Sequence, residues 1–95
     1  MPGSPSLYWK TQPTGSVGIS FTDLLNAAKQ VMKDANLTDI KMSAADVSGR
    51  TPNSHVAITF LKDGNSFTAI IMAAGDDGKM VLNQLSKALS KLHWL

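Results

Sequence analysis

Residues 55–74, HVAITFLKDGNSFTAIIMAA, decide the fold of this chain. Two strand-like segments, residues 55–61 and 66–74, are rich in β-branched and aromatic side chains and flank a short polar connection. That connection contains Asp63-Gly64, and Asp-Gly between apolar segments is typical of a tight hairpin turn. We therefore predict an antiparallel β-hairpin here.

The register of the predicted hairpin follows from its apolar pattern. With a two-residue loop at Asp63-Gly64, Phe60 opposes Phe67 and Ile58 opposes Ala69, so one face is wholly apolar. A slip of one residue would move every side chain to the other face. The pattern therefore favours an even register.

The second face of the hairpin mixes apolar and polar side chains. On it lie His55, Ala57, Thr59 and Leu61 from one segment and Ser66, Thr68, Ile70 and Met72 from the other. This composition is typical neither of a solvated face nor of a buried one. We expect it to be covered, either by the segment Leu7-Tyr8-Trp9 or by a second copy of the chain.

A helix is predicted on each side of the strands. Apolar residues recur at helical spacing after Ser20 (Phe21, Leu24, Leu25, Ala28, Val31, Met32, Ala35) and again after Gly78 (Val81, Leu82, Leu85, Ala88, Leu89, Leu92). Ser20 suits the N-cap of the first helix and Asn36 suits a left-handed C-cap. Asp76 and Asp77 are expected to cap the second helix, and Trp94 or Leu95 to hold its last turn.

A third strand is predicted before the hairpin. Residues 40–44 alternate apolar with polar, and the strand can continue to Val47 through a bulge where Ala44 and Ala45 adjoin. Residues 48–54 contain Gly, Pro, Asn and Ser and are predicted to form a loop.

These elements predict an α+β fold: a three-stranded antiparallel sheet with two helices packed on one face, in the order α-β-β-β-α. Residues 20–95 would form this single domain. Residues 1–19, rich in Pro and Gly, would be a flexible or loosely docked N-terminal arm. Leu7-Tyr8-Trp9 could add an extra edge strand to the sheet.

Composition limits the classes of function. The chain has 95 residues, 43% of them hydrophobic, which is enough for one domain with one core. Its formal net charge is +2, and the nine basic residues are dispersed with Arg50 as the one arginine, which argues against nucleic acid as a partner. The absence of cysteine excludes disulfides and thiolate chemistry.

Composition and the first residues of the sequence bear on the compartment. No apolar run is long enough to span a membrane, and the first residues do not resemble a signal peptide. The richness in Ser, Thr and Asn together with the absence of Glu favours an exported or periplasmic protein over a cytoplasmic one.

No catalytic, cofactor-binding or metal-binding set is predicted. His55 and His93 are far apart in the sequence, and nothing in their spacing indicates a pair. Asp76-Asp77 beside glycine lacks the alternating ligands of a calcium loop, and Lys79 is not followed by Ser or Thr as in a phosphate-binding loop.

The leading hypothesis is a small non-enzymatic binding module. It would meet a protein partner, or a second copy in a homodimer, through the second sheet face or an edge strand. The candidate interaction surface consists of Tyr8, Trp9, His55, Ala57, Leu61, Ile70 and Met72.

Two alternatives stay open. A small enzyme or ligand-binding protein would need a pocket near residues 48–55 where His55, Arg50 and an aspartate such as Asp46 converge. A nucleic-acid-binding domain would stack bases on Tyr8 and Trp9, although the central strands lack the aromatic residues of such platforms.

Overall fold

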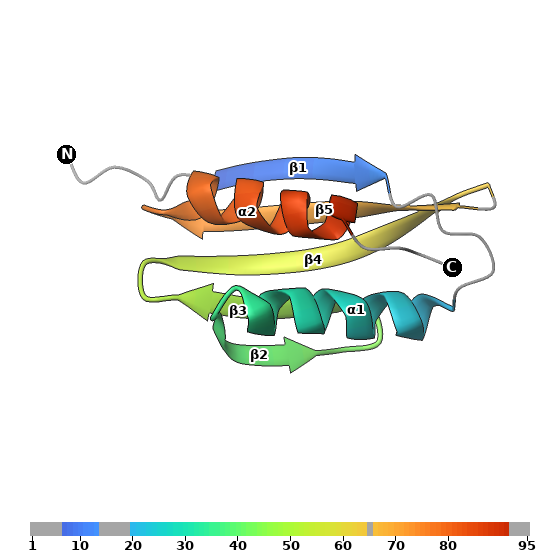
Figure 1. Cartoon of the computed structure of the whole chain (residues 1–95), viewed down its shortest axis with the longest axis horizontal. Helices are drawn as coiled ribbons and strands as arrows, with labels where there is room; N and C mark the ends of the chain where they lie inside the picture. The colour runs from blue at the N-terminus through green and yellow to red at the C-terminus, as the bar shows by residue number, and fades with distance from the viewer. Residues whose placement is uncertain (1–6, 14–19, 65, 92–95) are drawn as a thin grey trace.

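Five antiparallel strands and two helices make up the fold in the computed structural model, which describes residues 7–13, 20–64 and 66–91 (Figure 1). The strands line up in the spatial order β1-β5-β4-β3-β2. The elements are β1 (Leu7–Pro13), α1 (Phe21–Asp34), β2 (Thr38–Met42), β3 (Asp46–Thr51), β4 (Ser54–Asp63), β5 (Ser66–Gly75) and α2 (Gly78–Lys91).

The predicted class, α+β, is confirmed, but the predicted three-stranded sheet is wrong. One of the additional strands arises because the segment expected to be a single bulged strand turns back on itself between β2 and β3. The backbone N–H groups of Ala45 and Asp46 donate to Ser43 Oγ at 3.1 Å each, and Ser43 N–H donates to the Asp46 carbonyl at 2.9 Å. A short polar side chain thus satisfies the backbone of a tight turn.

The predicted loop over residues 48–54 is wrong as well, because most of it belongs to β3 and β4. Gly49, which suggested a loop, lies buried in β3 on the helix side of the sheet. A Cβ at this position would lie 3.2 Å from Met32 Sδ and 3.3 Å from Leu37 Cδ2. The glycine therefore lets the end of α1 pack closely on β3.

The remaining strand is β1, which pairs with β5 along its whole length, from Leu7 opposite Ala74 to Pro13 opposite Thr68. It forms one edge of the sheet. Residues 1–6 and 14–19 of the predicted arm, and Leu92, His93, Trp94 and Leu95 near the other end, lie outside the described residues.

The hairpin of β4 and β5 forms with a register two residues from the predicted one. Ile58 opposes Ile71 and Phe60 opposes Ala69, and the connection begins at Gly64, whose φ is 63°. Because the shift is an even number of residues, every side chain keeps the face that its alternation predicts.

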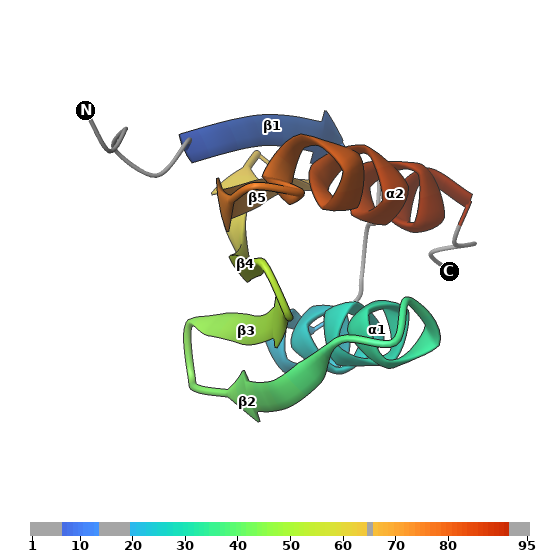
Figure 2. The same ribbon diagram turned by 90° about the vertical axis from the view of Figure 1, so that its left-hand side faces the viewer.

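Both helices lie on the same side of the sheet (Figure 2). The core between the layers combines one stripe of each helix with the inward residues of the central strands: Leu24, Leu25, Ala28, Val31, Met32, Val47, Val56, Ile58, Phe60, Ala69, Ile71, Ala73, Val81, Leu82, Leu85 and Leu89.

The predicted ends of α1 are confirmed. Ser20 Oγ accepts a hydrogen bond from the Asp23 N–H at 3.1 Å, as an N-cap does. At the other end Asn36 has a φ of 64°, and the Leu37 N–H donates to the Met32 carbonyl at 3.1 Å. This is the Schellman arrangement, and it turns buried Leu37 into the core.

Gly75, at the end of β5, provides a test of the fold. Its φ is 139°, and a Cβ would lie 2.1 Å from the Asn53 carbonyl oxygen. We predict that Gly75→Ala lowers the free energy of unfolding by about 3 kcal/mol or more, because backbone strain and steric overlap add. Urea denaturation measures the change.

Gly64→Ala is the matched control, because Gly64 also has a positive φ, +63°, but faces open space. This substitution should lower the free energy of unfolding by only about 1–2 kcal/mol. Equal losses in the two variants would contradict the close approach of Gly75 to the β3–β4 turn.

Candidate functional site

The face of the sheet opposite both helices, here called the open face, carries most of the exposed apolar side chains of the strands; Met42 of β2 is the exception, since it opposes buried Val47. Alternate residues of all five strands contribute to it, since successive side chains of a strand point to opposite faces. They are Leu7, Trp9, Thr11, Pro13, Asp39, Lys41, Asp46, Ser48, Arg50, His55, Ala57, Thr59, Leu61, Thr68, Ile70, Met72 and Ala74.

One row of directly opposed residues crosses the whole open face. Trp9 opposes Met72, Met72 opposes Ala57, Ala57 opposes Ser48, and Ser48 opposes Lys41. The row therefore changes from a large aromatic side chain on β1 to a cationic one on β2.

The neighbouring row shows the same change. Leu7 opposes Ala74, Ala74 opposes His55, and His55 opposes Arg50. Arg50 Nε lies 3.4 Å from Asp39 Oδ2 in an exposed ion pair. An exposed pair of this kind contributes little to stability.

Large apolar side chains cluster on the half of the open face formed by β1, β5 and the end of β4. We call Leu7, Trp9, Leu61, Ile70 and Met72 the apolar strip. Leu7 is 69% exposed, Trp9 68%, Leu61 60% and Met72 37%. Contiguous exposed apolar side chains are typical of interaction surfaces.

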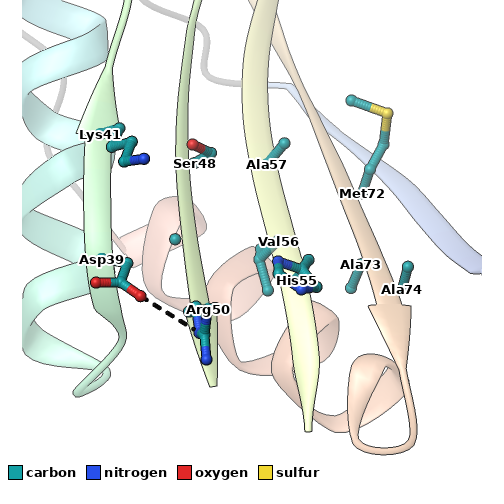
Figure 3. A pocket seen from close by; sticks show the side chains of 11 residues that line it. Asp39, Lys41, Ser48, Arg50, His55, Val56, Ala57, Met72, Ala73 and Ala74 are labelled. Atoms are coloured by element: carbon teal, nitrogen blue, oxygen red, sulfur yellow. Dashed lines mark ion pairs between the residues drawn. The ribbon is translucent and has the colours of Figure 1, made fainter. Parts of the chain in front are cut away.

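Beside the apolar strip the open face contains a hollow of about 510 Å³ (Figure 3). Its base is made of small residues, Ser48, Ala57 and Ala74 among them, which leave space between larger neighbours. Lys41, Arg50, His55 and Met72 supply the larger side chains around it. A volume of this size is in the range of ligand pockets.

The hollow has an excess of positive charge. Lys41 and Arg50 line it, and Asp39 is the one carboxylate among its lining residues. Within the described part of the chain, Lys41 has no ion-pair partner. The hollow thus offers cationic hydrogen-bond donors next to an apolar surface.

The predicted interaction residues are divided between the two faces of the sheet. Trp9, His55, Ala57, Leu61, Ile70 and Met72 lie on the open face. Tyr8 lies on the opposite face, where it packs against the core and its Cδ2 would be 3.0 Å from a Cβ on Gly78 of α2.

The three residues of the enzyme alternative do not converge. Arg50 and His55 are neighbours in the hollow, but Asp46 does not line it, and its Oδ1 accepts a hydrogen bond from Ser43 Oγ at 3.0 Å. Among the residues that the structure describes, His55 has no hydrogen bond to a hydroxyl or a carboxylate that would make a nucleophile–base pair.

Lys41 and Asp39 were missed as candidates for the hollow, whereas Ser48 lies within the range 48–55 named for the ligand-binding alternative. The alternation of residues 40–44 predicts which face Lys41 occupies. Nothing in the sequence indicates that Asp39 has a φ of 51°, or that the pairing of β2 shifts between Thr38 and Lys41. That irregularity brings Asp39 to Arg50.

A second polar cluster joins the β3–β4 turn to the start of α2. Asp77 accepts hydrogen bonds from Ser54 Oγ and from Thr51 Oγ1, which lies within 3.0 Å of both carboxylate oxygens. The side chain of Asp77, predicted to cap α2, thus holds a turn that is distant in sequence. The hydrogen bond from Ser54 lowers the pKa of Asp77 below its ordinary value of 3.8; Thr51 and the Asp77 N–H lower this pKa further, against partial burial.

The three residues of this cluster do not line the hollow, although Thr51 and Ser54 adjoin Arg50 and His55 in sequence. Ser54 is 4% exposed, and its hydroxyl is bound to a carboxylate without an imidazole between them. In the described ranges, no group of three His, Cys, Asp or Glu residues is placed to hold a metal ion. Neither helix there has the length and apolar character needed to cross a membrane.

Comparisons of this chain with protein-family models, curated proteins and solved structures find no significant match. The open face is therefore interpreted from its own residues.

The Asp77 cluster predicts a pH dependence of stability. Because the pKa of Asp77 is lowered in the folded state, its stabilising effect is present above about pH 3.8 and is lost as the pH falls through the lower folded value. Asp77→Asn should therefore be less stable than wild type at neutral pH, and this difference should shrink in strong acid. Thermal or urea unfolding over a pH series measures it.

Asp76→Asn is the control, since Asp76 is the exposed neighbour of Asp77. It should keep the wild-type stability at neutral pH. A difference between Asp77→Asn and wild type that is the same at every pH would contradict the role of the ionised carboxylate.

Proposed function

We propose that this chain is a non-enzymatic binding module that binds a protein partner through its open face. One observation carries the proposal: the apolar strip and the hollow share Met72 and lie on the face opposite the helices. Figure 2 shows both helices on the other side of the sheet, and Figure 3 shows Met72 at the hollow. A partner that covers the strip would remove apolar surface from water, which is the main source of affinity in most protein interfaces.

The size of the apolar strip supports this role. Full burial of one large apolar side chain contributes about 1.5–3 kcal/mol, and Leu7, Trp9 and Leu61 are each largely exposed in the free chain. An exposed charge pair contributes about 1 kcal/mol or less. The strip therefore supplies the larger share of the binding energy, and the charged half of the face adds specificity.

The two edges of the sheet are less suited to binding than the face. On β1, the edge strand carries exposed Lys10 and ends at Pro13, and both residue types oppose the addition of another strand. On β2, the strand is short, and its pairing shifts between Thr38 and Lys41 where Asp39 has a positive φ. These features favour the open face over an edge as the binding surface.

A second candidate function is the binding of a small ligand in the hollow. The neighbouring side chains of Arg50 and His55 and the volume of about 510 Å³ favour it. This candidate assigns ligand binding, and no catalytic step, to the hollow.

Selection from a displayed library of random linear peptides tests the proposed function. Peptides that bind the chain should bind at least tenfold more weakly to Met72→Ser and to Trp9→Ser, because each variant removes apolar contact from the strip. Calorimetric titration with the synthetic peptides measures the affinities, and circular dichroism checks that the variants are folded.

Met80→Ser is the matched control. Met80 is 65% exposed but lies on α2, in the other layer of the molecule. Its substitution should leave the peptide affinities unchanged. If Met72→Ser binds the selected peptides as tightly as wild type does, or if the library yields no binding peptide, the open face is not a peptide-binding surface and the proposal is wrong.

A further inference from the structure

We infer that the partner presents an acidic side chain to the hollow while an apolar side chain a few residues away in the same segment packs on Trp9 and Met72. This inference rests on the proposed function and names the chemistry of the segment that the open face binds. It assigns the charged half of that face to recognition of a carboxylate.

The donors around the hollow support a carboxylate ligand. A guanidinium has five N–H donors. Arg50 directs the one on Nε toward Asp39, so the donors on its two terminal nitrogens remain for a ligand. Lys41, which has no ion-pair partner among the described residues, adds three donors. His55 of β4, which opposes Arg50 of β3, also lines the hollow.

The small residues of the hollow leave room for a carboxylate-bearing side chain between its cations. Ser48, Ala57 and Ala74 make its base, and Lys41 and Arg50 lie beside it (Figure 3). A carboxylate that enters between these cations would displace water from the base of small side chains. With less water between the charges, its attraction to the cations is stronger than in bulk water.

The cross-strand rows set the distance between the two contacts. Met72 on β5 and Lys41 on β2 belong to one row and are separated by three strand spacings, which corresponds to about 14 Å at roughly 4.8 Å per spacing. An extended peptide covers this distance in about four residues. We therefore expect an acidic and a large apolar residue separated by that interval.

An acidic segment fits the open face better than a second copy of the chain does. A second copy brings its own Lys41 and Arg50, and its described carboxylates on that face, Asp39 and Asp46, already have partners in Arg50 and Ser43. Face-to-face pairing would therefore leave cations without an acidic counterpart. Association of like charges is unfavourable.

The test uses the library peptides and a charge reversal. Selected peptides should contain Asp or Glu at the expected interval from an aromatic or aliphatic residue. Lys41→Glu should bind such a peptide about tenfold more weakly, because attraction is replaced by repulsion. Lys79→Glu, an exposed residue of α2, changes the net charge equally and should bind as wild type does.

A double-mutant cycle isolates the contact. A peptide whose carboxylate is replaced by the corresponding amide should bind wild type more weakly, and Lys41→Glu should weaken its binding by less than about twofold. The coupling free energy between Lys41 and the peptide carboxylate should also decrease as the salt concentration rises, because exposed charges are screened. Equal effects of Lys41→Glu on the acidic and amide peptides would overturn the inference.

The outcomes separate this inference from the proposed function. Peptides that need Trp9 and Met72 but show no acidic preference overturn the inference alone. A library that yields no binding peptide overturns both. Sedimentation that shows self-association, abolished by Met72→Ser, would assign the open face to a second copy of the chain. Displacement of the peptides by free glutamate, with no dependence on Met72, would assign the hollow to a small ligand. Either result overturns the inference.

Discussion

The pairing of β4 with β5 is the interaction on which the rest of the structure depends. Ile58 and Ile71, opposite each other at its centre, are fully buried by the helix layer. Each strand of the pair recruits one neighbour, β3 on β4 and β1 on β5. Because the helices supply enough apolar surface to cover only one side of this sheet, the same pairing that builds the core also presents the open face.

Local periodicity predicted the parts of the fold that depend on neighbours in sequence. The stripes of the two helices, the Ser20 and Asn36 caps and the faces of the hairpin residues all follow from spacing alone. The strand number did not, because Gly49 indicates a loop in isolation and reveals its role only beside Met32 and Leu37. Ser43 likewise makes a turn through bonds to the backbone that alternation does not predict.

In the candidate site, too, only the features that depend on residues near in sequence could be predicted. Alternation placed His55, Ala57, Leu61, Ile70 and Met72 on one face, and the pairing of β1 with β5 places Trp9, also a predicted interaction residue, on the same face. The hollow depends on long-range facts: the order of the strands, the register of β3 on β4, and the irregular backbone at Asp39. No short-range pattern contains this information. Tyr8 and Trp9 are adjacent in sequence and therefore lie on opposite faces of the sheet, Tyr8 against the core and Trp9 on the surface.

The position of Trp9 on an edge strand has a thermodynamic consequence. β1 has one neighbour in the sheet, and α2 supports it through the Tyr8 contact and the hydrogen bond from Ser86 Oγ to Gln12 Oε1. Edge elements of this kind open at a lower free energy than central strands do. Binding of a partner to the apolar strip and pairing of β1 with β5 are therefore linked equilibria. A partner that contacts the Trp9 indole would raise the free energy of opening β1, and a change that favours the opened strand would lower the affinity for the partner by the same coupling free energy.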